Sequence, residues 1–536
     1  MGSLLLIVVC CLYVVAYHTY GRWIRQRLGL ADTVVTPAHR HRDGMDYMPT
    51  RRSVVLGHHF ASIAGVGPIV GPVLGVTFGW LPALLWIVVG NIFIGSVHDF
   101  TTLAASLRHD GKSIGSITEH YLGRSGKLVF LIFAWFSLVL VIAVFTIVVA
   151  KTFVAHPEAA TASALFVPIA VVFGVATQKG RLGLLPATVS GVLALLGAIW
   201  VGSVFPLSLS YNVWIALLLC YVFVASVTPV WVLLQPRDYL NSFLLYLMLA
   251  GGLLGLLLYR PSLQLEAFRG WSDPELGALF PILFVTVACG AISGFHSLVA
   301  SGTTAKQLDR ESDAQFVGYG SMLLEGVLAT IALIAAAMLD RGAYVAALKD
   351  DGAVGLFSRG LGSFVSTLGV PLALGTSFAA LTISAFALTT LDTSTRLGRY
   401  TFQEFFEGTR YEARLSRRGV ATLATVVLSA LLAVNKGGTM TIWPLFGAAN
   451  QMLAALALLT VAAYLSHRAV NNRFVLVPAG IMFTLTLSAI GWLVMKNLAT
   501  KNYPLVAIAI VLGGTAVYIA VLGFGRHRAT ARRAAE

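Results

Sequence analysis

The sequence predicts an all-α membrane protein with about fifteen transmembrane helices. Hydrophobic residues make up 57% of the 536 residues and charged residues only 11%, and the mean hydropathy is +0.82. A soluble domain carries roughly 25% charged residues because water must solvate its surface. A chain with so few charges needs lipid around most of its helices. Its formal net charge of +14 therefore indicates basic loops rather than nucleic-acid binding.

Fifteen apolar runs approach the roughly 20 residues that a helix needs to cross a bilayer. If all of them cross, the loops alternate between two sides, and one set of loops holds most of the 37 Lys and Arg residues. Because basic loops face the cytoplasm, we expect an external N-terminus and a cytoplasmic C-terminus. The runs lie at residues 2–20, 53–78, 80–107, 128–153, 163–177, 183–203, 211–234, 241–259, 277–301, 317–339, 370–391, 419–434, 439–465, 474–495 and 503–524.

The segment after the eleventh run mixes aromatic and charged residues. Phe402, Phe405 and Phe406 lie there beside Arg399 and Glu404. This pattern fits an amphipathic helix in the membrane interface, and it equally fits a plain extension of the preceding span.

The second run contains the clearest cluster of helix breakers: Gly65, Gly67, Pro68, Gly71 and Pro72. Proline removes a backbone hydrogen bond, and glycine weakens a helix. Backbone that is not helical at membrane depth must be buried or line a cavity. We expect the helix to unwind here and Gly65, Gly67 and Pro68 to contact the substrate. A proline kink repaired by neighbouring helices is the alternative.

The seventh run is interrupted by Thr228 and Pro229, and Trp231 follows in the same motif. By the alternation of loop charge, this run crosses the membrane in the direction opposite to the second run. Broken helices in corresponding places of two oppositely directed halves indicate an inverted repeat with a binding site at mid-membrane. We therefore expect Thr228, Pro229 and Trp231 to face the same cavity as the first break.

The expected organisation has four parts. Residues 1–52 form an extra N-terminal helix and a cytoplasmic loop. Residues 53–203 and 211–391 form two five-helix repeats. Residues 392–536 form about four C-terminal helices and a basic cytoplasmic tail.

Hydroxyl side chains recur every four residues in the ninth run. Ser293, Ser297 and Ser301 therefore share one face of a helix. Such a stripe could coordinate a small cation beside the unwound backbone of the second run. The common alternative is that each hydroxyl bonds back to its own helix.

Ionisable residues inside spans are costly and are therefore candidates for function. Five of them are candidates for ion or proton coupling, and structural pairing is the alternative for each. Adjacent helical residues point about 100° apart, so the two neighbouring histidines do not form a convincing metal site. The five residues are His58, His59, Asp99, His296 and Glu325.

Enzymatic and cofactor signals are missing from the sequence. The four cysteines, Cys10, Cys11, Cys220 and Cys289, lie within apolar runs and show no metal-ligand spacing. Metalloprotease, serine hydrolase, nucleotide-binding and paired-cysteine motifs are not found. We expect neither an enzyme nor a bound cofactor or metal, and we expect the lipid bilayer and a small molecule as partners.

Long motifs then point to a known family. DGMDYMPT (43–50), GHHFASIAGVGPIVGPVLG (57–75), HDF (98–100) with HDGKSIG (109–115), PVWVLLQPRDYLNSF (229–243) and SGFHSLVASGTTAKQL (293–308) resemble the carbon starvation protein A family. The resemblance covers nearly the whole chain. It implies a prokaryotic inner-membrane transporter associated with peptide uptake in carbon starvation, with some members importing pyruvate together with protons. It also implies a leucine-transporter-like fold, which is a five-plus-five inverted repeat.

These observations favour a cation-coupled importer, with protons preferred over sodium and peptides preferred as substrates. Pyruvate or another small carboxylate is the alternative substrate. The amides near Gly67 would receive a carboxylate, since helix N-termini attract anions. A nutrient sensor that no longer transports is an alternative from a different class, although no added signalling domain is evident.

Overall fold

The computed structural model describes the chain except residues 44–45, 179–182, 230–231, 435–437 and 534–536. The described residues are almost entirely helical, which confirms the predicted all-α class. Their only sheet is a two-stranded antiparallel ribbon, β1 (Ser272–Asp273) and β2 (Gly277–Ala278).

The helices fall into three stretches of the chain. The first stretch holds α1 (Gly2–Ala16), the π-helical turn η1 (Tyr17–Gly21), α2 (Arg22–Leu28), α3 (Pro37–Arg40), α4 (Arg52–Ile63), α5 (Gly67–Gly75), η2 (Val76–Phe78), α6 (Trp80–Gly90), η3 (Asn91–Gly95), α7 (Ser96–Arg108) and α8 (Ile114–Ala155). The second holds α9 (Pro157–Gln178), α10 (Leu184–Val204), α11 (Tyr211–Val227), α12 (Leu234–Tyr259), α13 (Leu279–Thr286), α14 (Phe295–Gly302), η4 (Thr304–Lys306), η5 (Gln315–Tyr319) and α15 (Gly320–Ala337). The third holds α16 (Arg341–Asp350), α17 (Gly352–Ser366), α18 (Leu372–Phe406), α19 (Glu412–Leu415), α20 (Arg418–Ala433), α21 (Gly438–His467), α22 (Arg473–Ala499) and α23 (Tyr503–Arg533).

The number of spans differs from the prediction. Among the described residues, 11 helices are long and apolar enough to cross a bilayer, or 12 if the bent pair α4–α5 is one span. The predicted count of fifteen is not confirmed. The three remaining runs correspond to α11 and α20, which have only 17 and 16 residues, and to α13–α14, which residues 287–294 separate.

Helix α18 settles the alternative left open after the eleventh run. It continues without interruption for 35 residues to Phe406. Phe402, Phe405 and Phe406 therefore lie on a plain extension of this helix, where Phe402 packs against Trp135 of α8.

The first predicted break is present. Helix α4 ends at Ile63, α5 begins at Gly67, and the two axes are bent by 50°. Residues 64–66 between them are fully buried. Unwinding thus occurs where the glycines and prolines cluster, and Pro68 occupies the first turn of α5, where proline is tolerated.

The second break lies elsewhere than predicted. Helix α11 ends at Val227 and α12 begins at Leu234. Thr228 and Pro229 are non-helical, as expected, but they belong to the connection between two helices and do not interrupt one span. The interrupted helix is the ninth run, where residues 287–294 separate α13 from α14. Where two apolar runs are only a few residues apart, the sequence does not distinguish a proline beside a helix end from a proline within a helix.

Glycines bring the two broken helices into direct contact. A Cβ on Gly67 would lie 2.4 Å from Cys289 Sγ, and one on Gly71 would lie 2.8 Å from the Thr286 carbonyl oxygen. A Cβ on Gly75 would lie 2.4 Å from Val287 Cγ2. One face of α5 therefore packs without side chains against the break between α13 and α14, as small residues permit between membrane helices.

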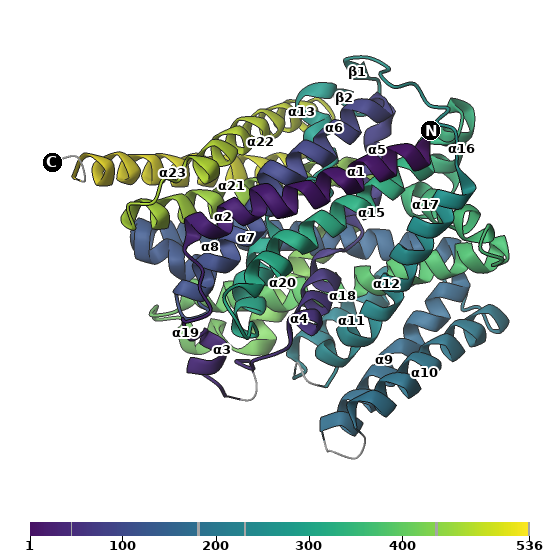
Figure 1. Cartoon of the computed structure of the whole chain (residues 1–536), viewed down its shortest axis with the longest axis horizontal. Coiled ribbons are helices and arrows are strands. Elements are labelled where there is room, and N and C mark those ends of the chain that lie inside the picture. The colour runs from purple at the N-terminus through teal and green to yellow at the C-terminus, as the bar shows by residue number, and fades with distance from the viewer. Residues whose placement is uncertain (44–45, 179–182, 230–231, 435–437, 534–536) are drawn as a thin grey trace.

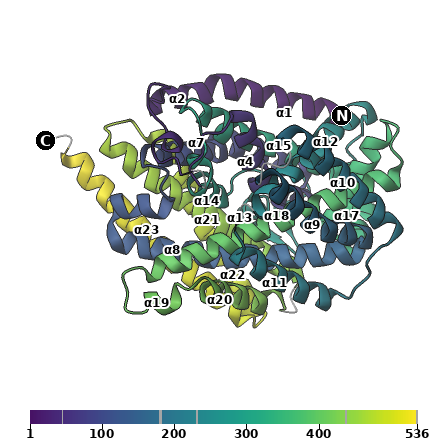
Figure 2. The same cartoon turned by 90° about the horizontal axis from the view of Figure 1, so that it is seen from below.

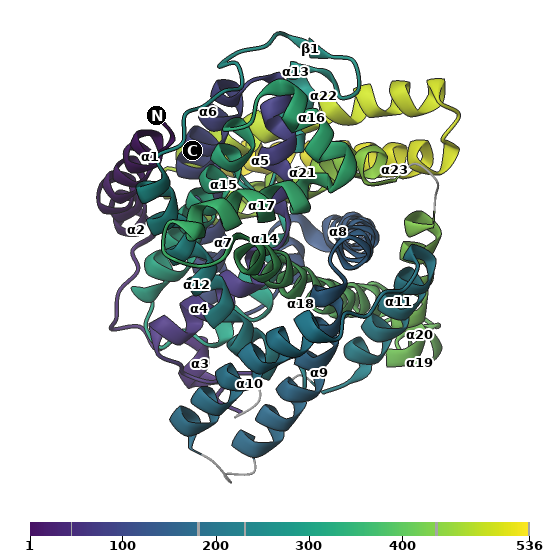
Figure 3. The same cartoon turned by 90° about the vertical axis from the view of Figure 1, so that its right-hand side faces the viewer.

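The helices around these breaks form a bundle. Helices α1 and α2, the α9–α10 hairpin and the α22–α23 hairpin lie at its periphery. Helices α1 and α2 run across one surface, with the N-terminus near α16 (Figure 1). Figure 2 shows the same pair along one edge of the bundle. Helix α8, viewed along its axis in Figure 3, is surrounded by other helices and packs against α18, α20, α21 and α23. The α9–α10 hairpin and the α22–α23 hairpin lie at opposite sides of the molecule (Figure 3).

The loop between α2 and α4 binds the segment that follows α14, and we call this contact the loop latch (residues 32–43 and 46–50 with 306–312). Thr36 Oγ1 donates to the Leu308 carbonyl over 2.8 Å, and the Thr50 amide donates to the Gln307 carbonyl over 3.0 Å. Ser312 Oγ donates to Asp32 Oδ2 over 3.0 Å, and this hydrogen bond lowers the pKa of the Asp32 carboxyl. The latch thus joins the segment that precedes α4 to the segment that follows α14.

Candidate functional site

Four helices that are distant in sequence bring ionisable side chains together in the protein interior. Helix α7 supplies Asp99, α14 supplies His296, α15 supplies Glu325 and α4 supplies His59. All four side chains are fully buried. We call these residues the relay cluster. All four were predicted individually from sequence, but their association was not.

His296 lies between the two carboxylates of the relay cluster. Its Nδ1 is 2.8 Å from Asp99 Oδ2, and its Nε2 is 3.4 Å from Glu325 Oε2. The other Asp99 oxygen is 2.8 Å from Nδ1 of His98. An imidazole that offers one nitrogen to each of two carboxylates can take up a proton from one side and release it to the other. His296 therefore bridges the two carboxylates, with a hydrogen bond to Asp99 and an ion-pair distance, without a hydrogen bond, to Glu325.

The relay cluster adjoins the first break. His296 lies next to the backbone of Ile63, the last residue of α4. His59 Nδ1 is 2.8 Å from Thr304 Oγ1, and no hydrogen-bond partner for its Nε2 lies within the described residues. His296 itself is on α14, directly after the second break. A change in proton occupancy would thus act on both broken helices.

Only histidines pair with the relay carboxylates. Within the described residues, Asp99 forms ion pairs with His98 and His296, and Glu325 forms one with His296. Neither Glu325 oxygen has a hydrogen bond there. Burying an unbalanced charge costs several kcal/mol, and the partners of these carboxylates in the described residues are titratable imidazoles rather than permanently charged guanidinium or ammonium groups. No metal-holding group of three His, Cys, Asp or Glu side chains occurs in this described part.

The serine stripe bonds mostly to its own helix. Ser297 Oγ donates to the Gly294 carbonyl, and Ser301 Oγ donates to the Ser297 carbonyl, each over 2.7 Å. Ser293 differs, because Asn450 Nδ2 of α21 donates to its Oγ over 3.0 Å. Asn450 Oδ1 also accepts the amide of Phe295 at the start of α14. The hydroxyls of Ser297 and Ser301 therefore have the back-bonded geometry that was the alternative to a cation site.

A second buried group of charges lies on the other side of α4, and we call it the arginine cluster. It consists of His58 of α4, Tyr221 of α11, Arg237 and Asp238 of α12, and Asp392 of α18. Arg237 Nη1 is 2.5 Å from Asp392 Oδ2, and the Tyr221 hydroxyl donates to the same oxygen over 2.8 Å. Asp238 is held less closely, because it lies 3.9 Å from Arg237 Nη2 and 4.0 Å from His58 Nδ1.

Two further arginines of α18 cap the end of α11. Arg396 Nη2 donates to the carbonyls of Ala225 and Thr228, each over 2.8 Å, and Arg399 Nη1 donates to the Ser226 carbonyl over 2.5 Å. Guanidinium groups satisfy carbonyls that have no partner in the last helical turn, and they interact favourably with its dipole. This capping fixes Thr228 beside α18.

The structure separates the predicted substrate residues. Gly65 lies beside Phe145 of α8 and Thr390 of α18, and Gly67 lies beside Cys289. Thr228 contacts Arg396, Pro229 is exposed, and Trp231 falls outside the described residues. The first group lies at the two breaks and the second at the α11–α12 connection.

Sequence reasoning missed the arginine cluster. Arg237 and Asp238 stand near the start of an apolar run, where charges are normally read as loop residues. The signal was an arginine and an aspartate directly after Pro236, a residue that the structure places in the first turn of a membrane helix.

A family model described as "Carbon starvation protein CstA" matches residues 1–350 and 345–489. The chain belongs to the carbon starvation protein CstA family. It is 34% identical over 561 residues to "Peptide transporter CstA" of Escherichia coli K12, which covers 90% of this chain and 79% of that protein. It is 32% identical over 567 residues to "Peptide transporter CstA" of Bacillus subtilis 168, covering 96% and 94%.

The CstA family also connects this chain to a second transporter name. "Pyruvate/proton symporter BtsT" of Escherichia coli K12 is 32% identical over 572 residues, covering 89% of this chain and 80% of that protein. Because curated relatives carry transporter names, the family is one of transporters and not of enzymes.

A solved structure supports the fold alone. The "Eremococcus coleocola manganese transporter in complex with an aromatic bis-isothiourea substituted compound" aligns with a TM-score of 0.50 and 14% identity, covering 90% of this chain and 99% of that one. A multi-pass transporter architecture is therefore shared at the level of the helices.

Proposed function

We propose that this chain is a proton-coupled secondary transporter that imports carboxylate-bearing metabolites across the cytoplasmic membrane, with short peptides as the first substrate class. The observation that carries the proposal is the Asp99–His296–Glu325 path, which is buried and adjoins both broken helices. Ionisable residues at membrane depth are characteristic of proton relays.

Protons fit the site better than sodium. A sodium site needs several oxygen ligands that point at one position, but the hydroxyls of Ser297 and Ser301 donate to their own helix. The relay cluster instead combines imidazoles and carboxylates, and histidine changes its charge near neutral pH. An inward proton also balances the charge of a carboxylate, which costs about 2.3 kcal/mol per 100 mV to move against a negative-inside potential.

The order of the helices supports an inverted repeat whose second half begins at α13. The broken pairs α4–α5 and α13–α14 pack against each other, and alternation of the intervening spans makes their directions opposite. With the peripheral α9–α10 hairpin and the shorter helices α16, α17 and α19 set aside, α6–α7, α8, α11 and α12 follow the first pair, and α15, α18, α20 and α21 follow the second. This assignment is an alternative to the repeats predicted at 53–203 and 211–391, which stay a prediction.

The start of α5 is the proposed position for a substrate carboxylate. Asn450 accepts the first amide of α14, whereas at the start of α5 Pro68 has no amide hydrogen and the amides of Ile69 and Val70 donate to the Val66 carbonyl, which leaves the Gly67 amide as the candidate donor. Free amides at a helix N-terminus attract anions. Peptides and pyruvate both carry a carboxylate, which accounts for relatives named for either substrate.

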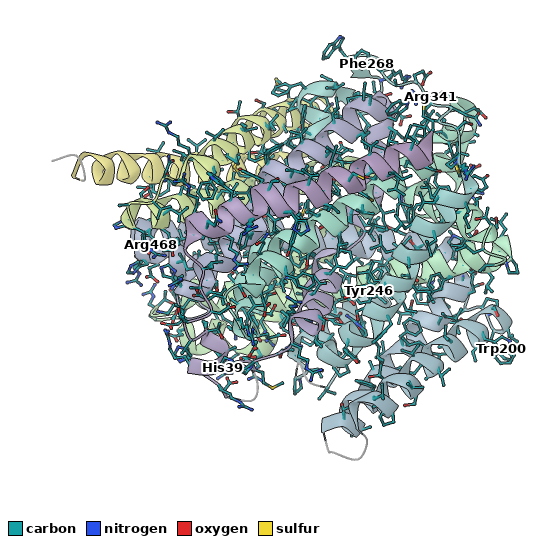
Figure 4. All side chains as sticks on the ribbon, viewed as in Figure 1. His39, Trp200, Tyr246, Phe268, Arg341 and Arg468 are labelled. Atoms are coloured by element: carbon teal, nitrogen blue, oxygen red, sulfur yellow. The ribbon has the colours of Figure 1, made fainter. Side chains whose placement is uncertain are left out.

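The orientation with an external N-terminus stays part of the proposal. His39 and Arg468 lie at the end of the bundle where α2 ends, and Phe268 and Arg341 lie at the opposite end near the N-terminus (Figure 4). Arg40 and Arg42 follow His39 closely in the chain. The positive-inside rule makes this end cytoplasmic.

Uptake into proteoliposomes tests the proposal. Purified protein is reconstituted, and labelled dialanine and pyruvate are supplied with an inward pH gradient or, separately, an inward sodium gradient at fixed pH. We expect accumulation with the pH gradient only. Accumulation that follows sodium would overturn proton coupling, and ligand binding without any uptake would support a nutrient sensor instead.

A further inference from the structure

Helix α4 separates two buried groups of charges, and its adjacent histidines face one group each. His59 contacts Thr304 beside the relay cluster, with Nδ1 2.8 Å from Oγ1. His58 points to the arginine cluster, with Nδ1 4.0 Å from Asp238 Oδ2. Adjacent helical side chains diverge by about 100°, so a single helix carries one titratable side chain toward each cluster.

Asp238 is the carboxylate with the weaker compensation in the arginine cluster. Asp392 lies 2.5 Å from Arg237 Nη1 and also receives the Tyr221 hydroxyl. Asp238, although fully buried, lies 3.9 Å from Arg237 and 4.0 Å from His58. Asp392 and Asp238 are both buried near the Arg237 guanidinium, and Asp392, the nearer of the two, forms the close ion pair with it.

The surroundings of Asp238 give it access to protons. The charged and titratable groups that face it are His58 from α4, Arg237 from α12, Asp392 and Arg396 from α18, and Tyr221 from α11. The His58 side chain is 18% exposed, whereas Asp238 is not exposed. His58 is therefore the more exposed member of this pair, and it is the candidate route for a proton to the buried carboxylate.

We propose that Asp238, with His58 as its access residue, is a second proton-binding site, distinct from the relay cluster. The inference rests on the proposed proton-coupled transport and deepens it. A proton that arrives on His58 passes to the Asp238 carboxylate and leaves a neutral imidazole beside a neutral acid. The electrostatic contact between α4 and α12 then disappears, and α4 is free to move. The transporter therefore carries two protons with each substrate molecule, one on each side of α4.

The number of protons can be measured from the accumulation at zero net flux. With the membrane potential held at zero, a tenfold proton gradient supports about hundredfold accumulation for two protons and about tenfold for one. The measurement uses the full chain in proteoliposomes with labelled dialanine or pyruvate, whichever shows uptake. We expect about hundredfold accumulation for the wild type and about tenfold for Asp238→Asn.

A matched variant and a second measurement complete the test. Asp340→Asn removes a carboxylate that lies outside both clusters, at the N-cap of α16, where asparagine also caps a helix, so it should retain the wild-type accumulation. Dicyclohexylcarbodiimide adds to protonated carboxylic acids in apolar surroundings, and we expect mass spectrometry of the wild type to find it on Asp238 more at pH 6 than at pH 8. This labelling needs no variant that must fold.

Three outcomes are distinguishable. Equal accumulation in wild type and Asp238→Asn, or labelling of Glu325 without Asp238, overturns the second site and leaves proton-coupled transport intact. Wild-type accumulation that ignores the pH gradient overturns the proposed function itself. A loss of one proton together with pH-dependent labelling supports the second site.

Discussion

The two sides of α4 hold their charges in different ways. On the His59 side, Asp99 and Glu325 are paired in the described structure only with histidines. On the His58 side, Asp392 is paired with Arg237, whose guanidinium keeps its charge at every physiological pH. Under the proposed function, the first side changes its total charge by taking up protons, whereas most of the second side keeps its charge. Burial alone therefore does not make a carboxylate functional, because the permanence of its partner decides whether it can titrate.

The largest effect is expected from removing the central carboxylate of the relay cluster. Asp99→Asn removes the negative charge and the titratable carboxyl that pair with His296, so pH-driven accumulation should fall to background. Wild-type uptake should rise as the external pH falls from 8 to 6, and the variant profile should be flat. Exchange of labelled for unlabelled substrate needs no net proton movement and should persist. Loss of exchange as well would show that Asp99 is required for more than coupling.

Breaking the permanent pair on the other side should damage stability more than coupling. Asp392→Asn leaves Arg237 buried without its close carboxylate, and removal of one partner of a buried ion pair costs about 3–5 kcal/mol. The measurement is thermal unfolding in nanodiscs. A double variant, Arg237→Met with Asp392→Leu, should recover most of the loss. A stable Asp392→Asn protein would contradict the proposed contrast between the clusters.

A substitution in α5, the helix that follows α4, tests whether close packing against Cys289 is needed for stability. Gly67→Ala places a Cβ 2.4 Å from the present position of Cys289 Sγ. We expect a loss of about 1–3 kcal/mol from overpacking, measured by thermal unfolding. Adding Cys289→Gly removes the clashing side chain and should restore most of the stability. Gly419→Ala, where a Cβ would meet open space, is the control.

Two serines of the ninth run, Ser293 before α14 and Ser297 within it, should differ by a smaller amount. Ser293→Ala removes an interhelical bond with Asn450, whereas Ser297→Ala removes a bond within α14. We expect the first change to cost about 1 kcal/mol and the second distinctly less. Both variants should retain uptake without sodium. Sodium-dependent uptake that either change abolishes would restore the cation-site interpretation.

The smallest effect concerns the loop latch, away from both clusters. Ser312→Ala removes the hydrogen bond that lowers the Asp32 pKa. A lowered pKa contributes stability above the ordinary pKa of about 4, and this contribution disappears as the pH falls through the folded-state value. The melting temperatures of variant and wild type should therefore differ slightly at pH 7 and converge in acid. A constant difference would exclude titration of Asp32 as the cause.

Sequence patterns predicted the first break and the individual relay residues, but they did not predict which residues these contact. The glycines and prolines near Gly65 act on the local backbone, so the unwinding that they cause can be predicted from the sequence. Pro229 was misassigned because the distance between two apolar runs does not reveal where one helix ends. Asp99, His296 and Glu325 are separated by hundreds of residues or by other helices, and only the tertiary fold determines that they meet. Arg237 and Asp238 appeared to be loop residues because their burial depends on α18.

The loop latch also has a consequence for how the protein is made. Thr36 and its partner Leu308 are 272 residues apart. A ribosome adding roughly 5–20 residues per second needs on the order of tens of seconds to synthesise the intervening chain. During that interval the first broken helix is already in the bilayer while the segment that fastens its end does not yet exist. The nascent protein therefore passes through a long stage with this end unfastened, and membrane chaperones that protect unfinished helices would act at that stage.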